Sequence, residues 1–133
     1  MVIVHTTVWI DYLRGAENPE TRWLDRELRR NRLGLTDLIL CEVLQGIRDA
    51  SGFSQVRSDL LKFQVFQTGG SIWPSQPRRT IATCAGKVTT SARLSIASLP
   101  LSVLQAQLGL LHRDHDFDPF EKVLGLKVVH PSP

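Results

Sequence analysis

Short apolar runs alternate with segments of helical periodicity along most of this chain. Val2 to Val4 is an uninterrupted β-branched run, which is typical of a strand that is buried on both faces. After a polar break that begins at His5, apolar residues recur at helical spacing as far as Gly15. Further apolar runs predict strands over 33–35, 65–66, 108–111 and 127–129.

The segments between these runs carry signals for helices. Helices are predicted over 19–30, 38–48 and 54–63. Asn18 is the expected N-cap of the first, with Pro19 at its first position, and Thr36 and Asp37 are suited to cap the second. Strands that alternate with helices indicate an α/β fold, in which helices cover both faces of a central parallel sheet.

The composition predicts one soluble domain over 1–131. A chain of 133 residues with 42% hydrophobic residues and a mean hydropathy of −0.07 is long enough for one packed core. No apolar run approaches the ~20 residues of a membrane span, and no signal peptide precedes the first strand. Cys41 and Cys84 have no metal-like spacing, which indicates reduced thiols in the cytoplasm. The net charge of +3 permits RNA binding without requiring it.

Polar side chains suited to chemistry follow the predicted strands. In parallel α/β sheets, ligands bind beyond the carboxyl ends of the strands, where His5 is the first polar residue. Glu42 has apolar neighbours in the second of the three helices, and a buried carboxylate is costly unless it is paired or bound to metal. Asp114 and Asp116 follow the fourth strand. A simpler interpretation makes Glu42 a solvated helix residue. Likewise, Asp114 and Asp116 are either part of a site or ordinary loop acids, with Asp116 as a cap for the segment from Phe117.

Two further features have a functional and a structural interpretation. Thr6 is either a hydroxyl that takes part in a site or a simple helix cap. An arginine-rich run is suited to contact phosphates or an acidic partner, and it is equally consistent with a solvated helix face. Its members are Arg14, Arg22, Arg26, Arg29, Arg30 and Arg32.

Two motifs resemble a known family. They are Thr-Thr-Val-Trp-Ile-Asp-Tyr-Leu-Arg-Gly over 6–15 and Leu-Ile-Leu-Cys-Glu-Val-Leu-Gln-Gly over 38–46. Both resemble PIN-domain ribonucleases, in particular the toxins of VapBC-type toxin–antitoxin pairs. The resemblance covers 1–70 and 108–131. The family has an Asp at the position of His5, so this chain departs from the pattern at the first metal-binding carboxylate.

The resemblance implies a three-layer α/β/α PIN domain and a metal-dependent endoribonuclease. Glu42, Asp114 and Asp116 match the family's catalytic acids, His5 stands with Glu42 and Asp116 at its metal-binding positions, and Thr6 matches a hydroxyl that positions the substrate. Mg²⁺ or Mn²⁺ would supply a hydroxide-like nucleophile and neutralise charge on the phosphate. Such hard cations prefer oxygen ligands, and therefore His5 is a poor replacement for a carboxylate. We expect cleavage by this chain to be impaired.

The same resemblance implies partners and a compartment. A type II toxin of this kind would have a VapB-like antitoxin that blocks the site, an RNA substrate, a homodimeric state and a cytoplasmic location without membrane contact. Two alternatives are a catalytically inactive PIN remnant that only binds antitoxin or RNA, and an incompletely folded product without function. Salt-dependent RNA binding without cleavage would indicate the first alternative, and a non-cooperative melt the second.

The middle of the chain, about 71–107, is aberrant for this family. Residues 60–113 contain no Asp or Glu, although about five would be expected from the overall frequency of acids. One permitted back-translation of 94–100, read one nucleotide earlier, encodes an Asp-containing heptad that resembles the helix with the family's third acid. Our hypothesis is that this segment was translated out of frame. A divergent Ser/Thr-rich loop is the alternative, and the coding DNA decides between them.

Overall fold

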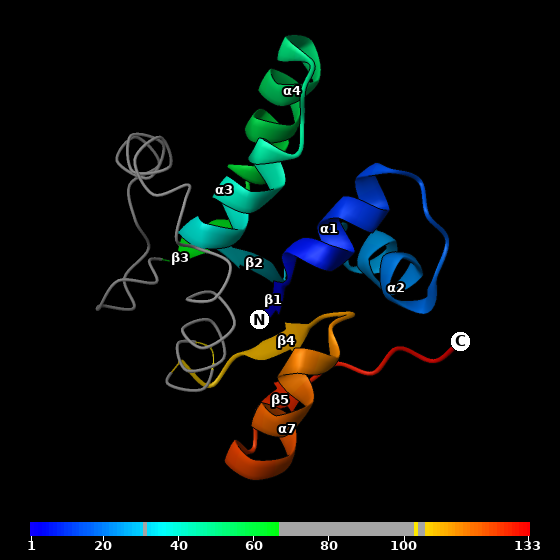
Figure 1. Ribbon diagram of the computed structural model, residues 1–133, viewed down its shortest axis with the longest axis vertical. Helices are drawn as coiled ribbons and strands as arrows, with labels where there is room; N and C mark the ends of the chain where they lie inside the picture. Colours follow the sequence, from blue (N-terminus) through cyan, green and yellow to red (C-terminus); the bar gives the residue numbers. More distant parts are fainter. Residues whose placement is uncertain (31, 67–102, 104–105) are drawn as a thin grey trace.

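The computed structural model describes residues 1–30, 32–66, 103 and 106–133, and in them a five-stranded sheet. The strands lie in the order β3-β2-β1-β4-β5, and every neighbouring pair is parallel (Figure 1). The predicted α/β fold with a central parallel sheet is therefore confirmed. The strands are β1 (Val2–Val4), β2 (Leu33–Thr36), β3 (Gln64–Phe66), β4 (Gly109–Leu111) and β5 (Lys127–Val128).

The helices form layers on the two faces of this sheet. From β1 the chain passes to β2 and then to β3, whereas from β4 it passes to β5 in the opposite direction. Because crossovers between parallel strands are right-handed, the helices of the first two connections lie on one face and the helix of the last on the other (Figure 1). The helices are α1 (Thr6–Leu13), α2 (Pro19–Glu27), α3 (Asp37–Gln45), α4 (Ala50–Leu60) and α7 (Asp118–Leu124).

Side-chain caps set the beginnings of the helices. Asn18 caps α2 in a reciprocal capping box with Thr21, and Thr36 caps α3 by accepting a hydrogen bond from the Ile39 N–H. Both predicted caps are confirmed. The predicted start of the next helix is too late, because Asp49 caps α4 by accepting from the Gly52 N–H. The small residues that open α4, Ala50 to Gly52, carry no apolar periodicity, so the pattern misses its first turn.

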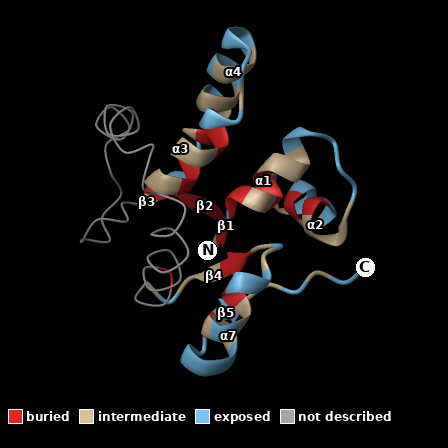
Figure 2. Cartoon of the chain, in the orientation of Figure 1, coloured by how far each residue is buried: buried red, intermediate tan, exposed pale blue. Residues whose placement is uncertain are grey.

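The apolar core joins β1, β2 and β4 to α1, α2 and α3 (Figure 2), and the half-buried Phe120 of α7 packs against it. Trp9 is buried, and Tyr12 and Trp23 are half-buried against the core. In the described residues, no helix is long and apolar enough to cross a membrane. Cys84 lies outside the described residues, so the expectation of reduced thiols stays a prediction.

The aberrant segment over 71–107 lies almost wholly outside the described residues. The out-of-frame hypothesis, and the position at which the family's third acid is expected, fall in that part of the chain. Both therefore stay predictions.

Candidate functional site

The sheet order places two polar segments next to each other. The chain leaves β1 toward β2, and β4 lies on the other side of β1, so the carboxyl ends of β1 and β4 flank a topological switch point. In open parallel sheets, this crevice is where ligands bind. His5 follows β1, and its N–H donates to the Leu111 carbonyl at the end of β4, at 2.9 Å. The residues after β4 therefore lie beside the start of α1.

His5 is the N-cap of α1 and is only 8% exposed. Its Nδ1 accepts a hydrogen bond from the Thr7 N–H, at 3.4 Å, and lies 3.1 Å from Thr7 Oγ1. Burial lowers the pKa of His5 to about 4, with a smaller lowering by His112 and an opposing effect of Asp114. The imidazole is therefore neutral at pH 7. The cap is His5, so the interpretation of Thr6 as the cap is wrong.

Thr6 instead joins α1 to α3. Its Oγ1 donates to Glu42 Oε2 at 2.5 Å, across 36 positions of sequence. Glu42 is half-buried on α3, a helix whose beginning Thr36 fixes at the end of β2. The interpretation of Glu42 as a simply solvated helix residue is therefore wrong, because the carboxylate is held toward the end of β1.

The loop after β4 is organised by Asp114 rather than by Asp116. Asp114 Oδ1 accepts from the Asp116 N–H at 3.0 Å and caps the short 3₁₀ helix η1 (His115–Phe117). The Asp114 N–H in turn donates to His112 Nδ1 at 3.2 Å. The Asp116 side chain is exposed, and the proposed cap at Asp116 is wrong, since α7 begins after Phe117 without a side-chain cap.

Phe117 separates the two histidine rings of the site. Its ring centroid lies 4.8 Å from that of His5, in an edge-to-face arrangement, and 4.9 Å from that of His112. Burial also lowers the pKa of His112, and its Nε2 is buried without a hydrogen-bond partner among the described residues. Phe117 itself is fully buried. The ring thereby packs both histidines into the edge of the apolar core.

An ion-pair network that the sequence interpretation missed holds this loop against α1 and α2. Arg113 Nη1 lies 2.5 Å from Asp11 Oδ2, and Nε lies 3.6 Å from Glu20 Oε2. The Arg113 N–H also donates to Thr7 Oγ1 at 3.3 Å, and Asn18 donates to the same Asp11 oxygen at 3.2 Å. No local pattern reveals these contacts, because Arg113 and Asp11 are 102 positions apart.

The donors near the switch point fit a hard divalent cation only in part. Glu42 and Asp114 offer carboxylate oxygens, whereas the neutral, buried ring of His5 occupies the position of the family's first carboxylate. Over the described ranges, no three His, Cys, Asp or Glu side chains form a group that could hold a metal ion. The predicted metal set of His5, Glu42 and Asp116 therefore stays a prediction.

Comparisons with known proteins do not identify the chain. No family model matches it, and no curated protein matches it. Membership of the PIN-domain family therefore stays a proposal. It depends on the two motifs over 6–15 and 38–46, and it gains support from the parallel sheet and from the contact between Thr6 and Glu42.

Proposed function

We propose that this chain is the toxin component of a type II toxin–antitoxin system, with a PIN-type endoribonuclease site of strongly reduced activity. The observation that carries the proposal is the hydrogen bond from Thr6 to Glu42 at the switch point. It brings together the two motifs on which the resemblance depends, at the edge of the sheet where parallel α/β folds bind ligands. The loop with Asp114 and Asp116 follows the neighbouring strand.

The reduced activity follows from the residue at the end of β1. When bound, Mg²⁺ or Mn²⁺ supplies an activated water and neutralises charge on the scissile phosphate. Glu42, Asp114 and Asp116 are the residues that would hold it, and Thr6 would orient Glu42 through its hydroxyl. A neutral imidazole at His5 adds no negative charge, and its Nδ1 already accepts from a backbone N–H. One carboxylate of the set is therefore missing.

The proposed partners follow from the same function. They are a VapB-like antitoxin that covers the site, an RNA substrate and a second copy of the chain. RNA is the substrate, so the proposed compartment is the cytoplasm. Thiols are kept reduced in that compartment. Thiol titration of the protein purified under anaerobic, reducing conditions would show whether Cys41 and Cys84 are reduced there.

RNA digestion with added Mg²⁺ or Mn²⁺, with and without chelator, tests the proposal. The unaltered chain should cleave far more weakly than a variant that combines His5→Asp with the 71–107 segment restored to the other reading frame. His5→Asp alone should restore little, because the third acid would still be missing. Glu42→Gln in the restored chain is the matched control and should abolish the recovered cleavage. A restored chain without chelator-sensitive cleavage would refute the nuclease assignment.

A second function is favoured by the burial of His5. At the position of the family's first carboxylate, this chain has the neutral ring of His5, which packs against Phe117. Such a site is suited to an inactive PIN remnant that only binds antitoxin or RNA. RNA binding that weakens with salt, together with no cleavage by the unaltered chain, would select this function.

A further inference from the structure

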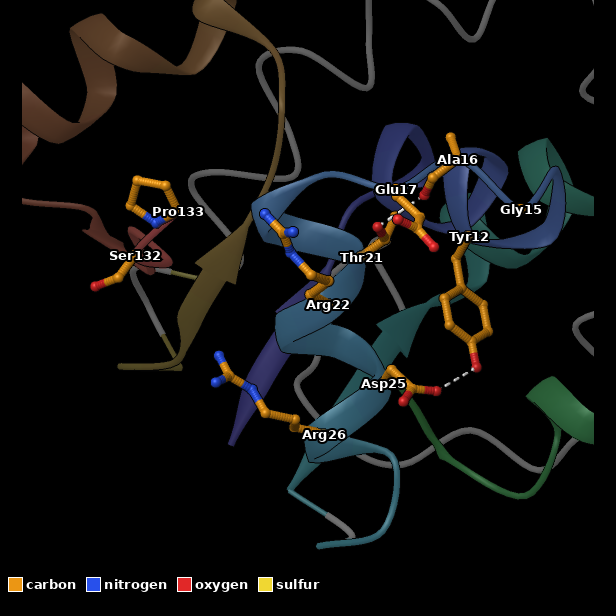
Figure 3. A pocket seen from close by; sticks show the side chains of 10 residues that line it. All are labelled: Tyr12, Gly15, Ala16, Glu17, Thr21, Arg22, Asp25, Arg26, Ser132 and Pro133. Carbon is orange, nitrogen blue, oxygen red and sulfur yellow. Dashed lines mark hydrogen bonds between the residues drawn. The ribbon is translucent and has the colours of Figure 1, made fainter.

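A cavity of about 720 Å³ lies at the opposite end of α1 from His5 and Thr6. The loop between α1 and α2, the exposed side of α2 and the C-terminal residues Ser132 and Pro133 line it (Figure 3). The two ends of an eight-residue helix are roughly 11 Å apart, so the cavity is separate from the switch point. Its volume is within the range of known ligand pockets.

Two arginines on α2 form one wall of this cavity. Arg22 and Arg26 are exposed, lie one turn apart, and both point toward Ser132 and Pro133 (Figure 3). Among the ion pairs of the described residues, none involves either arginine, whereas Arg30, beyond the end of α2, is paired with Glu27 at 2.9 Å. Guanidinium groups without a carboxylate partner are suited to bidentate contacts with phosphate.

The other side of the cavity carries an aromatic ring and two acids. The Tyr12 hydroxyl donates to Asp25 Oδ1 at 3.0 Å, and Glu17 lies in the same lining (Figure 3). Tyrosine rings stack on nucleobases, and carboxylates accept hydrogen bonds from the amino groups of bases. A purely anionic ligand has no use for these acids, whereas a nucleic acid has both phosphates and base amino groups.

We propose that this cavity binds a segment of single-stranded RNA, with phosphates on Arg22 and Arg26 and a base against Tyr12. Arg22 and Arg26 line the part of the cavity next to Ser132 and Pro133, whereas Tyr12 lies on its other side, so the ligand is an extended strand and not a free nucleotide (Figure 3). The inference rests on the proposed function in one respect, because it makes the cavity a second contact for the RNA that reaches Glu42. It adds a substrate-holding surface away from the reacting atoms.

Fluorescence anisotropy with a labelled 12-nucleotide RNA of mixed sequence, in chelator, tests the proposal at several salt concentrations. The double variant Arg22→Gln/Arg26→Gln should bind more weakly, and the slope of log affinity against log salt should fall by about 1.4, from two lost phosphate contacts. Lys122→Gln/Lys127→Gln makes the same charge change on exposed residues of α7 and β5 and should leave the slope unchanged. Equal slopes in both double variants and the unaltered chain would overturn the proposal.

Variants of Tyr12 test the base contact. Tyr12→Phe should bind RNA like the unaltered chain, whereas Tyr12→Leu should bind roughly 5- to 150-fold more weakly at an unchanged salt slope. Equal binding by both would overturn the stacking contact. Circular dichroism melts check that each variant folds.

Competition distinguishes the ligand classes and the two sites. Cytidine monophosphate should not displace the RNA, and displacement by poly-glutamate at equal charge would overturn RNA in favour of an acidic peptide. Binding that is lost in Glu42→Gln but retained in Arg22→Gln/Arg26→Gln would place the RNA at the switch point alone. That result would overturn this inference and support the proposed function. Binding at the cavity in a restored chain that does not cleave RNA would support this inference and refute the proposed nuclease function.

Discussion

Acid should destabilise this fold through the side chain of His5. In the unfolded chain the pKa of His5 is 6.5, and in the fold burial lowers this pKa to about 4. Between these two values the unfolded state binds more protons than the folded state, so the free energy of unfolding falls as the pH falls. The contribution of the neutral ring is complete above pH 6.5 and is lost once the pH is below about 4.

The expected size of this effect follows from the two pKa values of His5. Each unit of difference corresponds to 1.36 kcal/mol, so the difference between 6.5 and about 4 is worth about 3 kcal/mol at full protonation. His5 is only 8% exposed, and solvent therefore screens little of this effect. The free energy of unfolding of a typical domain is about 5–15 kcal/mol, so the loss expected at His5 is a large part of it.

Urea unfolding at pH 8, 6.5, 5 and 4 measures this loss when the unaltered chain is compared with His5→Asn. Asparagine retains a side-chain cap for α1 and takes up no proton in this range. From pH 8 to pH 4, the unfolding free energy of the unaltered chain should fall by about 3 kcal/mol more than that of His5→Asn. His115→Asn, at a fully exposed histidine, is the matched control, and its unfolding free energy should fall in acid as much as that of the unaltered chain. Parallel pH profiles for the unaltered chain and His5→Asn would refute the reasoning.

Two substitutions in the loop after β4 test its packing and its ion pairs. Arg113→Gln removes the contacts to Asp11 and Glu20, and because these groups are partly exposed the unfolding free energy should fall by only about 0.5–1 kcal/mol. Hydrogen exchange at the Asp114 amide should accelerate more than in β1. An unchanged rate there would contradict the role of these ion pairs in holding the loop against α1 and α2. Phe117→Ala empties a fully buried position and should cost about 3–5 kcal/mol in urea unfolding. A loss below about 1 kcal/mol would contradict the packing of this ring between two histidines.

Short-range signals predicted most of the secondary structure in the described residues. Asn18 with Pro19 and Thr36 mark helix beginnings because a cap is a contact between neighbours in sequence. The apolar run from Val2 to Val4 predicted a buried strand because its composition alone suits a position between two helical layers. The beginning of α4 was missed, since its cap at Asp49 precedes residues without an apolar stripe.

The sequence by itself determined the alternation of strands and helices and the residues suited to chemistry. Only the tertiary structure decided which of them meet. Thr6 reaches Glu42, and Arg113 reaches Asp11, because parallel strand pairing brings distant segments to one edge of the sheet. The pKa of His5 is likewise a property of the packed state, since desolvation needs the burial that the ring of Phe117 and its neighbours create. Local patterns contain neither the partner nor the burial, because both depend on contacts across the whole chain.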